Sequence, residues 1–459
     1  MKAVSDVRTR ITDSPFYQHL WGTAEAREVL GDDGRLLGWL EVIVALARAQ
    51  AATGVIPDRA ARLIAEHARP GRLDLAYAAE QTRQTSHSML GLIRALQEAL
   101  PEEAREYVYV GATVQDVTDT WTALALRRIG AIVWRDLRRI EEQLLELAAA
   151  HRSTVMAGRT HGQPGSPVTF GWKAASWADE VRRHLDRLRQ GAPRWLVGQL
   201  GGGVGSLVFY GERGPAVRAR FCAELGLADP GISWLSARDR GAEVAQLLAL
   251  ICGTLARIGG EVYELQRPEI GEIAEAAAAA AVGSITMPHK RNPESSEHLD
   301  TLARLVRANA AVMTEAVVQQ HERDGRGWKA EWVALPEACL LATAALQIAI
   351  GVLGDLTVDP AAMRDNLARH GGYPVGERAL ALLAPRMGAR RAQDRLQEAF
   401  GARTAGLTAE QALVRAGLLS PAEARELTSR PDTGSCQAMT DMVVQRARAA
   451  RAAEPEQWP

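Results

Sequence analysis

The sequence predicts an all-α protein built around a bundle of long helices, and two observations support this prediction. Aromatic residues make up only 5% of the 459 residues, while alanine, leucine, arginine and glutamate are abundant, a composition that favours helix over strand. Apolar residues between 126 and 147 also recur at steps of three or four, which is typical of a helix packed against neighbouring helices. These seam residues are Leu126, Ile129, Val133, Leu137, Ile140, Leu144 and Leu147.

Similar patterns predict further long helices in the middle of the chain, separated by clusters of glycine and proline. We expect them over roughly 36–52, 171–190, 241–268, 299–320 and 336–353. Beyond residue 360 the helical patterns become shorter and more polar and end in "RAAEPEQWP", which we expect to be a frayed tail. The predicted domains are an N-terminal helical domain over 1–108, a central bundle over 109–356 and a small C-terminal helical domain over 357–459.

Charge and cysteine content exclude several classes of protein. The chain carries 54 Lys and Arg against 55 Asp and Glu, so it lacks the one-signed charge that attracts nucleic acid or an anionic membrane. The four cysteines have no CxxC spacing and the N-terminus has no apolar signal core, a pattern that predicts a cytoplasmic protein. No stretch approaches 18 uncharged apolar residues, so we do not expect a membrane span.

Three polar segments interrupt the apolar helices: "GATVQDVTDT" (111–120), "AGRTHGQPGSP" (157–167) and "GSITMPHKRNP" (283–293). Each has an ordinary structural explanation when taken alone. Thr113 could cap the helix that follows. His161 could be a hydrogen-bonded loop histidine, and Lys290 could be a solvated loop charge.

Taken together and in this order, the three segments resemble the three signature regions of the fumarase/aspartase superfamily, whose loop is usually written GSSxMPxKxNP. The finer resemblance is to the branch that contains adenylosuccinate lyase and 3-carboxy-cis,cis-muconate cycloisomerase. "MPHKRNP" and "HERDGRGWKAEWVALPEA" (321–338) are most similar to the cycloisomerase group. Adenylosuccinate lyases usually end a serine-rich stretch with Val-Glu-Arg where this chain has "GRGWKAEW", which argues against that activity.

The resemblance implies a cofactor-independent β-elimination, in which a proton is removed next to a carboxylate and a group leaves the adjacent carbon. Ser284 stands at the position of the family's general base and His161 at that of its general acid. Lys290 and Asn292 would hold the carboxylate and stabilise the charge that develops on it.

The remaining expected substrate contacts come from the other two signature regions and from one residue outside them. These residues are Thr113, Gln115, Thr160, Gln163 and His87. His87 resembles a histidine of adenylosuccinate lyases that is followed by aspartate, but here Ser88 follows it. The resemblance also implies a homotetramer in which three subunits share each active site, although the seam of residues 126–147 could equally be buried within one chain.

No metal or cofactor is expected, since the sequence has no metal-ligand cluster, dinucleotide fingerprint or P-loop. "GGGVGS" (201–206) aligns with a segment that the family uses for tight helix packing. Val114 and Ile285 replace serines of the family pattern, and each change is expected to remove a hydroxyl from the pocket. These departures predict an intact elimination chemistry with a substrate that differs from the standard ones.

The leading hypothesis is therefore a lyase that releases fumarate, or a fumarate-like acid, from a small succinyl-type substrate. Cycloisomerisation of 3-carboxy-cis,cis-muconate, a specialised lyase activity such as nitrosuccinate cleavage, and adenylosuccinate cleavage are the alternatives within the superfamily. A non-catalytic structural protein on the same fold is the alternative of another class, but it would predict loss of the catalytic residues, which are present.

Overall fold

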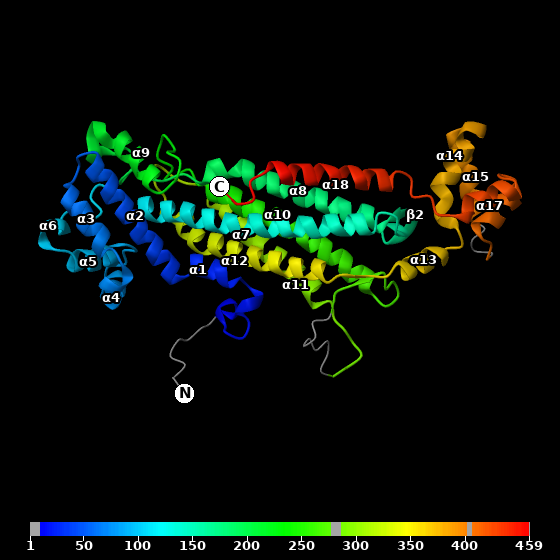
Figure 1. The fold of residues 1–459 in the computed structure, drawn as a ribbon, viewed down its shortest axis with the longest axis horizontal. Helices are drawn as coiled ribbons and strands as arrows, with labels where there is room; N and C mark the ends of the chain where they lie inside the picture. The colour runs from blue at the N-terminus through cyan, green and yellow to red at the C-terminus, as the bar shows by residue number, and fades with distance from the viewer. Residues whose placement is uncertain (1–9, 277–285, 402–405, 459) are drawn as a thin grey trace.

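The computed structural model describes residues 10–276, 286–401 and 406–458, and its architecture confirms the predicted helical fold. The N-terminal part packs short helices at one end of the molecule (Figure 1). Its elements are η1 (Ile11–Asp13), η2 (Gln18–Leu20), α1 (Ala24–Leu30), α2 (Asp32–Ala52), α3 (Asp58–His67), η3 (Pro70–Arg72), α4 (Leu75–Thr85), α5 (Leu90–Ala99) and α6 (Glu102–Arg105).

Five long helices run side by side through the middle of the molecule, as the apolar periodicity predicts (Figure 1). They are α7 (Val114–Ala150), α8 (Phe170–Trp195), α10 (Asp239–Gln266), α11 (Glu294–Glu315) and α12 (Gly325–Gly354). Between them lie β1 (Val155–Thr160), β2 (Gln163–Thr169), η4 (Val208–Arg213), α9 (Gly214–Glu224) and β3 (Ile273–Ala274), and β4 (Thr357–Val358) follows α12.

The apolar seam of α7 is buried inside a single chain. Leu137, Ile140 and Leu144 are completely inaccessible to solvent, and α8 and α12 both pack against α7. Of the two explanations left open by the sequence, burial of the seam within one chain is the correct one.

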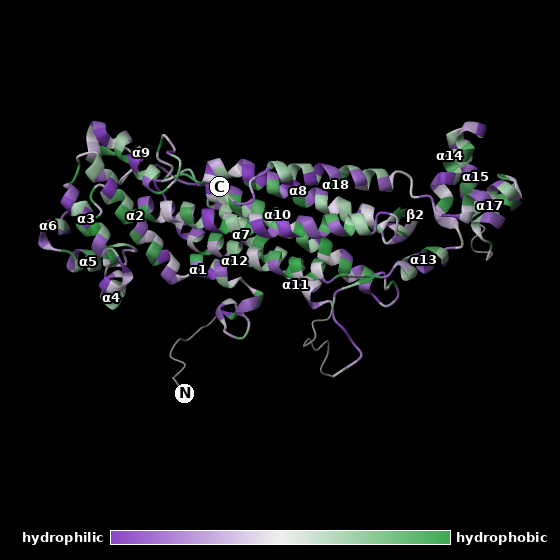
Figure 2. Cartoon of the chain, in the orientation of Figure 1, coloured by the Kyte–Doolittle hydropathy of each residue, from purple (hydrophilic) through white to green (hydrophobic). Residues whose placement is uncertain are grey.

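Two of the bundle helices, α10 and α12, are long and apolar enough to cross a membrane by length and composition alone. Most of the most apolar 18-residue window of each helix is buried, as is usual for helices in the core of a soluble protein. Figure 2 shows apolar residues spread along these helices with hydrophilic residues between them. Their apolar character is therefore explained by the core that they form.

Strands β1 and β2 form an antiparallel hairpin at the end of the bundle opposite the N-terminal helices (Figure 1). Thr160 pairs with Gln163, and the two residues between them, His161 and Gly162, both have positive φ angles, 53° and 72°. Positive φ at both central residues is characteristic of a type I′ turn, which matches the twist of a hairpin. The turn therefore places His161 at the tip.

A small C-terminal cluster has its own apolar core, which includes Leu383, Leu396 and Leu413. Its elements, with the helices that connect it to the bundle, are α13 (Pro360–Ala368), η5 (Tyr373–Val375), α14 (Gly376–Met387), α15 (Ala389–Gly401), α16 (Ala409–Arg415), α17 (Pro421–Ser429) and α18 (Cys436–Ala453). Helix α18 leaves the cluster and packs against α8 and α7 (Figure 1). The bounds of the three predicted domains remain a prediction.

The expectation of a frayed C-terminal tail is wrong. The ring of Trp458 lies 6.4 Å from that of Trp195 in a stacked arrangement and 5.9 Å from that of Trp134. The indole N–H of Trp134 also donates a hydrogen bond to the carbonyl of Glu456, at 3.2 Å. The side chain of Glu454 in the same tail is buried and lies 3.0 Å from Arg182 of α8, so aromatic and charged contacts together order a segment whose composition is polar.

Candidate functional site

The N-terminal end of α7 is held by a buried carboxylate. Asp116 and Thr113 form a capping box, in which the backbone N–H of Thr113 donates to Asp116 Oδ2 at 2.8 Å. The backbone N–H groups of Gly201 and Gly202 donate to the same carboxylate at 2.8 and 2.9 Å, and the side-chain amide of Gln199 donates at 3.2 Å. The expectation that the glycine-rich segment serves helix packing is therefore incomplete, because its backbone binds Asp116.

Burial raises the pKa of Asp116 to about 6, although the four hydrogen bonds that it accepts act in the opposite direction. The carboxylate is almost completely inaccessible to solvent. Asp116 thus shapes the segment around Thr113 from inside the protein and is not in a position to bind a solvated ligand.

Arg323 joins the two predicted substrate contacts of this region. Its Nε donates to Gln115 Oε1 at 2.6 Å, and its Nη1 donates to Thr113 Oγ1 at 2.7 Å. The amide nitrogen of Gln115 donates in turn to the carbonyl of Leu235, at 3.1 Å. A half-buried guanidinium fixed beside a hydroxyl is a suitable anchor for a carboxylate.

Arg323 was not among the residues predicted from the sequence. It lies in "HERDGRGW", part of the segment that is most similar to the cycloisomerase group, and it is 208 residues away from Gln115 along the chain. The presence of an arginine in that segment was the available signal. Its contact with Gln115 depends on how α12 packs against α7.

A second buried network lies one helical turn further along α7. Arg238 donates to both oxygens of Asp119, at 2.6 and 3.1 Å, and to both oxygens of Glu331, at 2.6 and 2.8 Å. All three side chains are more than nine-tenths buried. Burial raises the pKa of Glu331, which Arg238 partly counteracts. The network ties α7, α10 and α12 together beneath the candidate site.

The structure places His161, Thr160 and Gln163 far from Thr113 within one chain. All three are exposed at the tip of the β1–β2 hairpin. The 37 residues of α7 separate the hairpin from Thr113, which at about 1.5 Å per residue corresponds to about 55 Å. One copy of the chain therefore cannot bring these two regions into one site (Figure 1).

The hairpin is fixed to the bundle by a second ion pair. Arg159 donates to both oxygens of Glu272, at 2.6 and 2.8 Å, and the side-chain amide of Asn366 donates to the same carboxylate at 2.9 Å. Glu272 is completely buried. These contacts hold the base of the hairpin while its tip remains exposed.

The third predicted region lies only partly within the described residues. Ser284, the predicted base, and Ile285 lie outside them. Lys290 is exposed, and its backbone N–H donates to the carbonyl of Met287 at 2.9 Å. Asn292 donates through its side-chain amide to Glu294 Oε1, at 3.0 Å.

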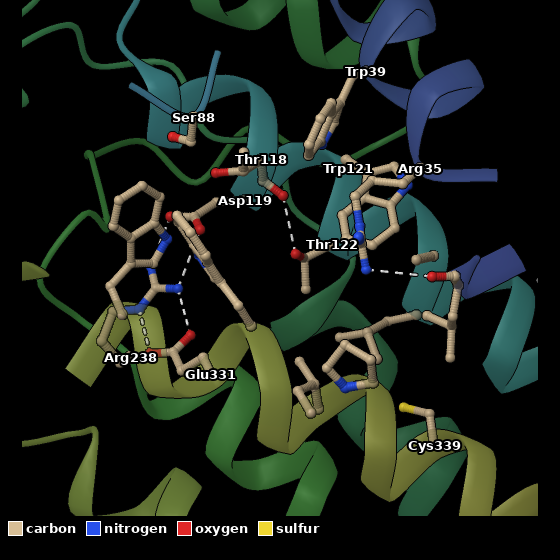
Figure 3. Close-up of a pocket in the computed structure, with 17 residues that line it drawn as sticks. Arg35, Trp39, Ser88, Thr118, Asp119, Trp121, Thr122, Arg238, Glu331 and Cys339 are labelled. Atoms are coloured by element: carbon tan, nitrogen blue, oxygen red, sulfur yellow. Dashed lines mark hydrogen bonds and ion pairs between the residues drawn. The ribbon is translucent and has the colours of Figure 1, made fainter. Parts of the chain in front are cut away.

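His87 is exposed and serves as a cap. Its Nδ1 accepts hydrogen bonds from the backbone N–H groups of Leu90, at 3.1 Å, and Met89, at 3.4 Å, at the start of α5. Its neighbour Ser88 lines a cavity whose wall also includes Trp39, Trp121, Trp328 and Trp332 (Figure 3). The side chain of Val114 is 6% exposed and packs in the hydrophobic core of the chain, and the expectation that it removes a hydroxyl from the pocket remains a prediction.

Within the described residues, no three histidine, cysteine, aspartate or glutamate side chains are grouped so that they could hold a metal ion. The described residues place the guanidinium of Arg323 and the hydroxyl of Thr113 at one end of the bundle, and the exposed imidazole of His161 at the other.

Comparison with known proteins identifies the family. A family model described as a lyase matches residues 2–308, about two thirds of the chain. The chain belongs to this lyase family. As implied by its signature regions, it is an enzyme of the fumarase/aspartase superfamily, and its relatives include both succinyl lyases and a cycloisomerase.

Two relatives and one solved structure show which activities are found among proteins similar to this chain. An N-acetyl-S-(2-succino)cysteine lyase of Dickeya dadantii is 43% identical over 360 residues, 78% of this chain and 79% of the relative. A 3-carboxy-cis,cis-muconate cycloisomerase of Pseudomonas aeruginosa is 42% identical over 368 residues, 80% of each chain. The crystal structure of the 3-carboxy-cis,cis-muconate lactonizing enzyme from Pseudomonas putida has a TM-score of 0.87 at 32% identity, covering 95% of this chain and 99% of that one.

Proposed function

We propose that this lyase cleaves the C–S bond of a 2-succinyl thioether, releasing fumarate and a thiol. The observation that carries the proposal is the Arg323 guanidinium fixed beside Thr113 and Gln115, because these groups can anchor one carboxylate of a succinyl group. The 43% identity to an N-acetyl-S-(2-succino)cysteine lyase supports sulfur as the leaving atom.

In the proposed reaction, Ser284 removes a proton from the carbon next to the second carboxylate, which Lys290 and Asn292 hold. The electron pair of that C–H bond forms the new C=C bond, and the C–S bond breaks with its electrons on sulfur. His161 then donates a proton to the departing thiolate. Lys290 supplies the positive charge that the carbanion-like transition state requires.

These roles require residues from different copies of the chain. Within one chain, about 55 Å separates Thr113 from the hairpin that carries His161. We therefore propose a cytoplasmic homotetramer whose copies exchange these regions at shared active sites. Exposed apolar residues on the bundle helices, such as Leu250 and Val333, provide a surface suited to contact between copies.

A cycloisomerase is the second candidate, favoured by the 42% identical relative and by the solved structure with a TM-score of 0.87. That reaction would use the same proton transfer next to a carboxylate, with a carboxylate of the same molecule as leaving group. Arg323 and Thr113 would serve as the anchor in both reactions.

The first experiment compares four substrates on one enzyme preparation: a 2-succinyl thioether, 3-carboxy-cis,cis-muconate, nitrosuccinate and adenylosuccinate. Fumarate release or muconate consumption is followed by ultraviolet absorbance. The proposal expects the thioether to have the highest kcat/KM, and a higher value for the muconate would replace it with the cycloisomerase.

The second experiment tests shared sites by mixing two inactive variants, His161→Gln and Arg323→Met, after dissociation and reassociation. Mixed assemblies should regain activity, because some sites then receive both native residues from different copies. Two preparations of the same variant, mixed in the same way, provide the control. If assemblies that are shown to contain both variants regain no activity, the shared-site arrangement is contradicted.

A further inference from the structure

The backbone ladder of the β1–β2 hairpin is interrupted close to the tip that carries His161. Two of the five residue pairs in the ladder have a proline on β2: Pro164, opposite Arg159, and Pro167. Proline has no N–H group and cannot donate a ladder hydrogen bond. The register also shifts between Ala157 and Arg159, so a bulge lies just before the tip. The ladder alone therefore fixes the tip poorly.

The conformation of the tip itself also needs support. His161 has a φ of 53°, a left-handed conformation that costs energy in any residue with a side chain and persists only where the surroundings hold it. Thr160, His161 and Gln163 are all exposed, so packing of the tip against its own chain does not hold it. A group that takes part in catalysis must nevertheless be placed to within about 0.5 Å.

Arg159, two residues before His161, makes a contact that the ladder cannot supply. Its guanidinium donates to both carboxylate oxygens of Glu272, at 2.6 and 2.8 Å. Two parallel hydrogen bonds fix the orientation of the arginine as well as its distance. The hydroxyl of Ser166 on β2 also donates to Glu377 of α14, at 2.7 Å, but that contact is exposed and competes with water. The pair with Glu272 is therefore the stricter constraint on the hairpin.

Glu272 is itself held from several sides. Its side chain is completely buried, and the amide of Asn366 on α13 donates to it at 2.9 Å and to the carbonyl of Ile270 at 2.8 Å. The backbone carbonyl of Glu272 accepts a hydrogen bond from the N–H of Asp359, also at 2.9 Å. Stability alone explains this ion pair poorly, because desolvation of two charges offsets most of their attraction. A fixed geometry is what the arrangement provides.

We infer that Glu272 is a positioning residue for proton donation by His161, that it acts through Arg159, and that Asn366 fixes its carboxylate. Glu272 is buried and touches no substrate, so it works only by setting where the hairpin tip lies. A displacement of about 1 Å in a reacting group can lower a rate by about 10²-fold. The inference rests on the proposed function, because it requires His161 to be the proton donor.

The first test varies how much help the leaving thiol needs from a proton donor. The 2-succinyl thioethers of ethanethiol and 2,2,2-trifluoroethanethiol are similar in size, but the fluorinated thiol is the stronger acid and its thiolate leaves with less need of a proton. Glu272→Gln should lower kcat about 10- to 100-fold for the ethanethiol compound and less than about threefold for the fluorinated one. Equal losses for both compounds, or no loss for either, would overturn the inference.

Three further variants accompany this test. His161→Gln removes the donor and should show the same dependence on the thiol. Arg218→Met breaks a pair with Asp229 near α9, at the opposite end of the molecule from the hairpin, and should affect both compounds equally or not at all (Figure 1). Asn366→Leu keeps the ion pair and removes one donor to Glu272, so a smaller loss with the same dependence on the thiol is expected. If Glu272→Gln does not fold, Asn366→Leu decides by the same criterion.

Failure of the inference can be distinguished from failure of the proposed function. If the native protein releases fumarate from neither thioether, the proposed function is wrong, and equal losses in His161→Gln would remove His161 as the donor. If only His161→Gln depends on the thiol, the function stands and the inference fails.

A measurement without turnover tests the positioning itself. Amide hydrogen exchange over residues 157–168 should become faster in Glu272→Gln and stay unchanged in Arg218→Met, because only the first variant weakens the contact that fixes the hairpin. Unchanged exchange in Glu272→Gln would overturn the inference whatever the substrate.

Discussion

The two ends of α7 differ in how completely one chain constructs them. At the N-terminal end, Asp116 accepts four hydrogen bonds, and Arg323 is fixed by Gln115 and Thr113. At the other end, His161 projects from the tip of a hairpin and is exposed. The N-terminal end is preorganised by contacts within the chain. At the other end the imidazole is exposed, where another molecule can contact it.

This difference explains how a single fold could supply both binding and chemistry. A preorganised anchor loses little entropy when it binds a carboxylate, whereas a group at an exposed tip can enter a neighbouring copy. Substitutions of the buried charges beneath the Arg323 anchor should therefore affect mainly stability, and substitutions at the exposed tip should affect mainly turnover.

The largest effect is expected at the hairpin. His161→Gln should lower kcat for fumarate release by about 10²–10⁴-fold, the usual contribution of a positioned general acid. Because the side chain is exposed, the thermal midpoint should change by less than about 2 °C. Parallel assays and melting curves check both, and a kcat within threefold of the native value would remove His161 as the proton donor.

At the buried end, Arg238→Met should lower the free energy of unfolding by about 3–5 kcal/mol, because it leaves Asp119 and Glu331 as uncompensated buried charges. Urea denaturation measures this change. Arg220→Met, which breaks a surface pair with Glu224, should cost less than about 1 kcal/mol. Similar losses in the two variants would show that the buried network contributes no more than a surface pair.

The pKa of Asp116 gives the buried end a pH dependence. Its folded-state pKa of about 6 lies above the ordinary aspartate value of 3.8, so its favourable contribution is present below about pH 4 and is lost as the pH rises through 6. Relative to Asp116→Asn, the native protein should lose up to about 3 kcal/mol of unfolding free energy between pH 4 and pH 7.

Denaturation of both proteins across this pH range checks the prediction. Glu146→Gln, which changes an exposed carboxylate on the same helix, serves as the control and should show little pH-dependent difference from the native protein. A difference between native protein and Asp116→Asn that is constant with pH would contradict the raised pKa.

The smallest effect is expected at His87, which lies outside both ends. His87→Ala should cost about 0.5–1 kcal/mol of unfolding free energy, because it removes the cap on the Met89 and Leu90 N–H groups. If kcat/KM falls by more than tenfold while stability changes this little, His87 also contacts the substrate.

Features that depend on local sequence were the ones that could be predicted. The long helices follow from apolar periodicity, and the cap at Thr113 follows from the preference for threonine at the start of a helix. The positions of the bundle helices are confirmed in the structure to within about five residues at most ends, and the starts of α7 and α12, which lie more than ten residues earlier than expected, are the exceptions.

Features that depend on distant contacts were missed or mistaken. Arg323 reaches Gln115 across 208 residues of sequence, and no local pattern encodes that distance. The tail was expected to fray because its composition is polar, whereas Trp458 and Glu454 fix it through contacts with α7 and α8.

The path of the chain through the C-terminal cluster has an evolutionary consequence. Helices α13 and α18 connect the cluster to the rest of the molecule, the first packing against β1 and the second against α8. The cluster between them has a separate apolar core and is joined to the bundle through a helix at each of its two ends. Such a segment can be lengthened, trimmed or exchanged during divergence while the bundle keeps its own contacts, which makes it the natural place for related enzymes to differ in size.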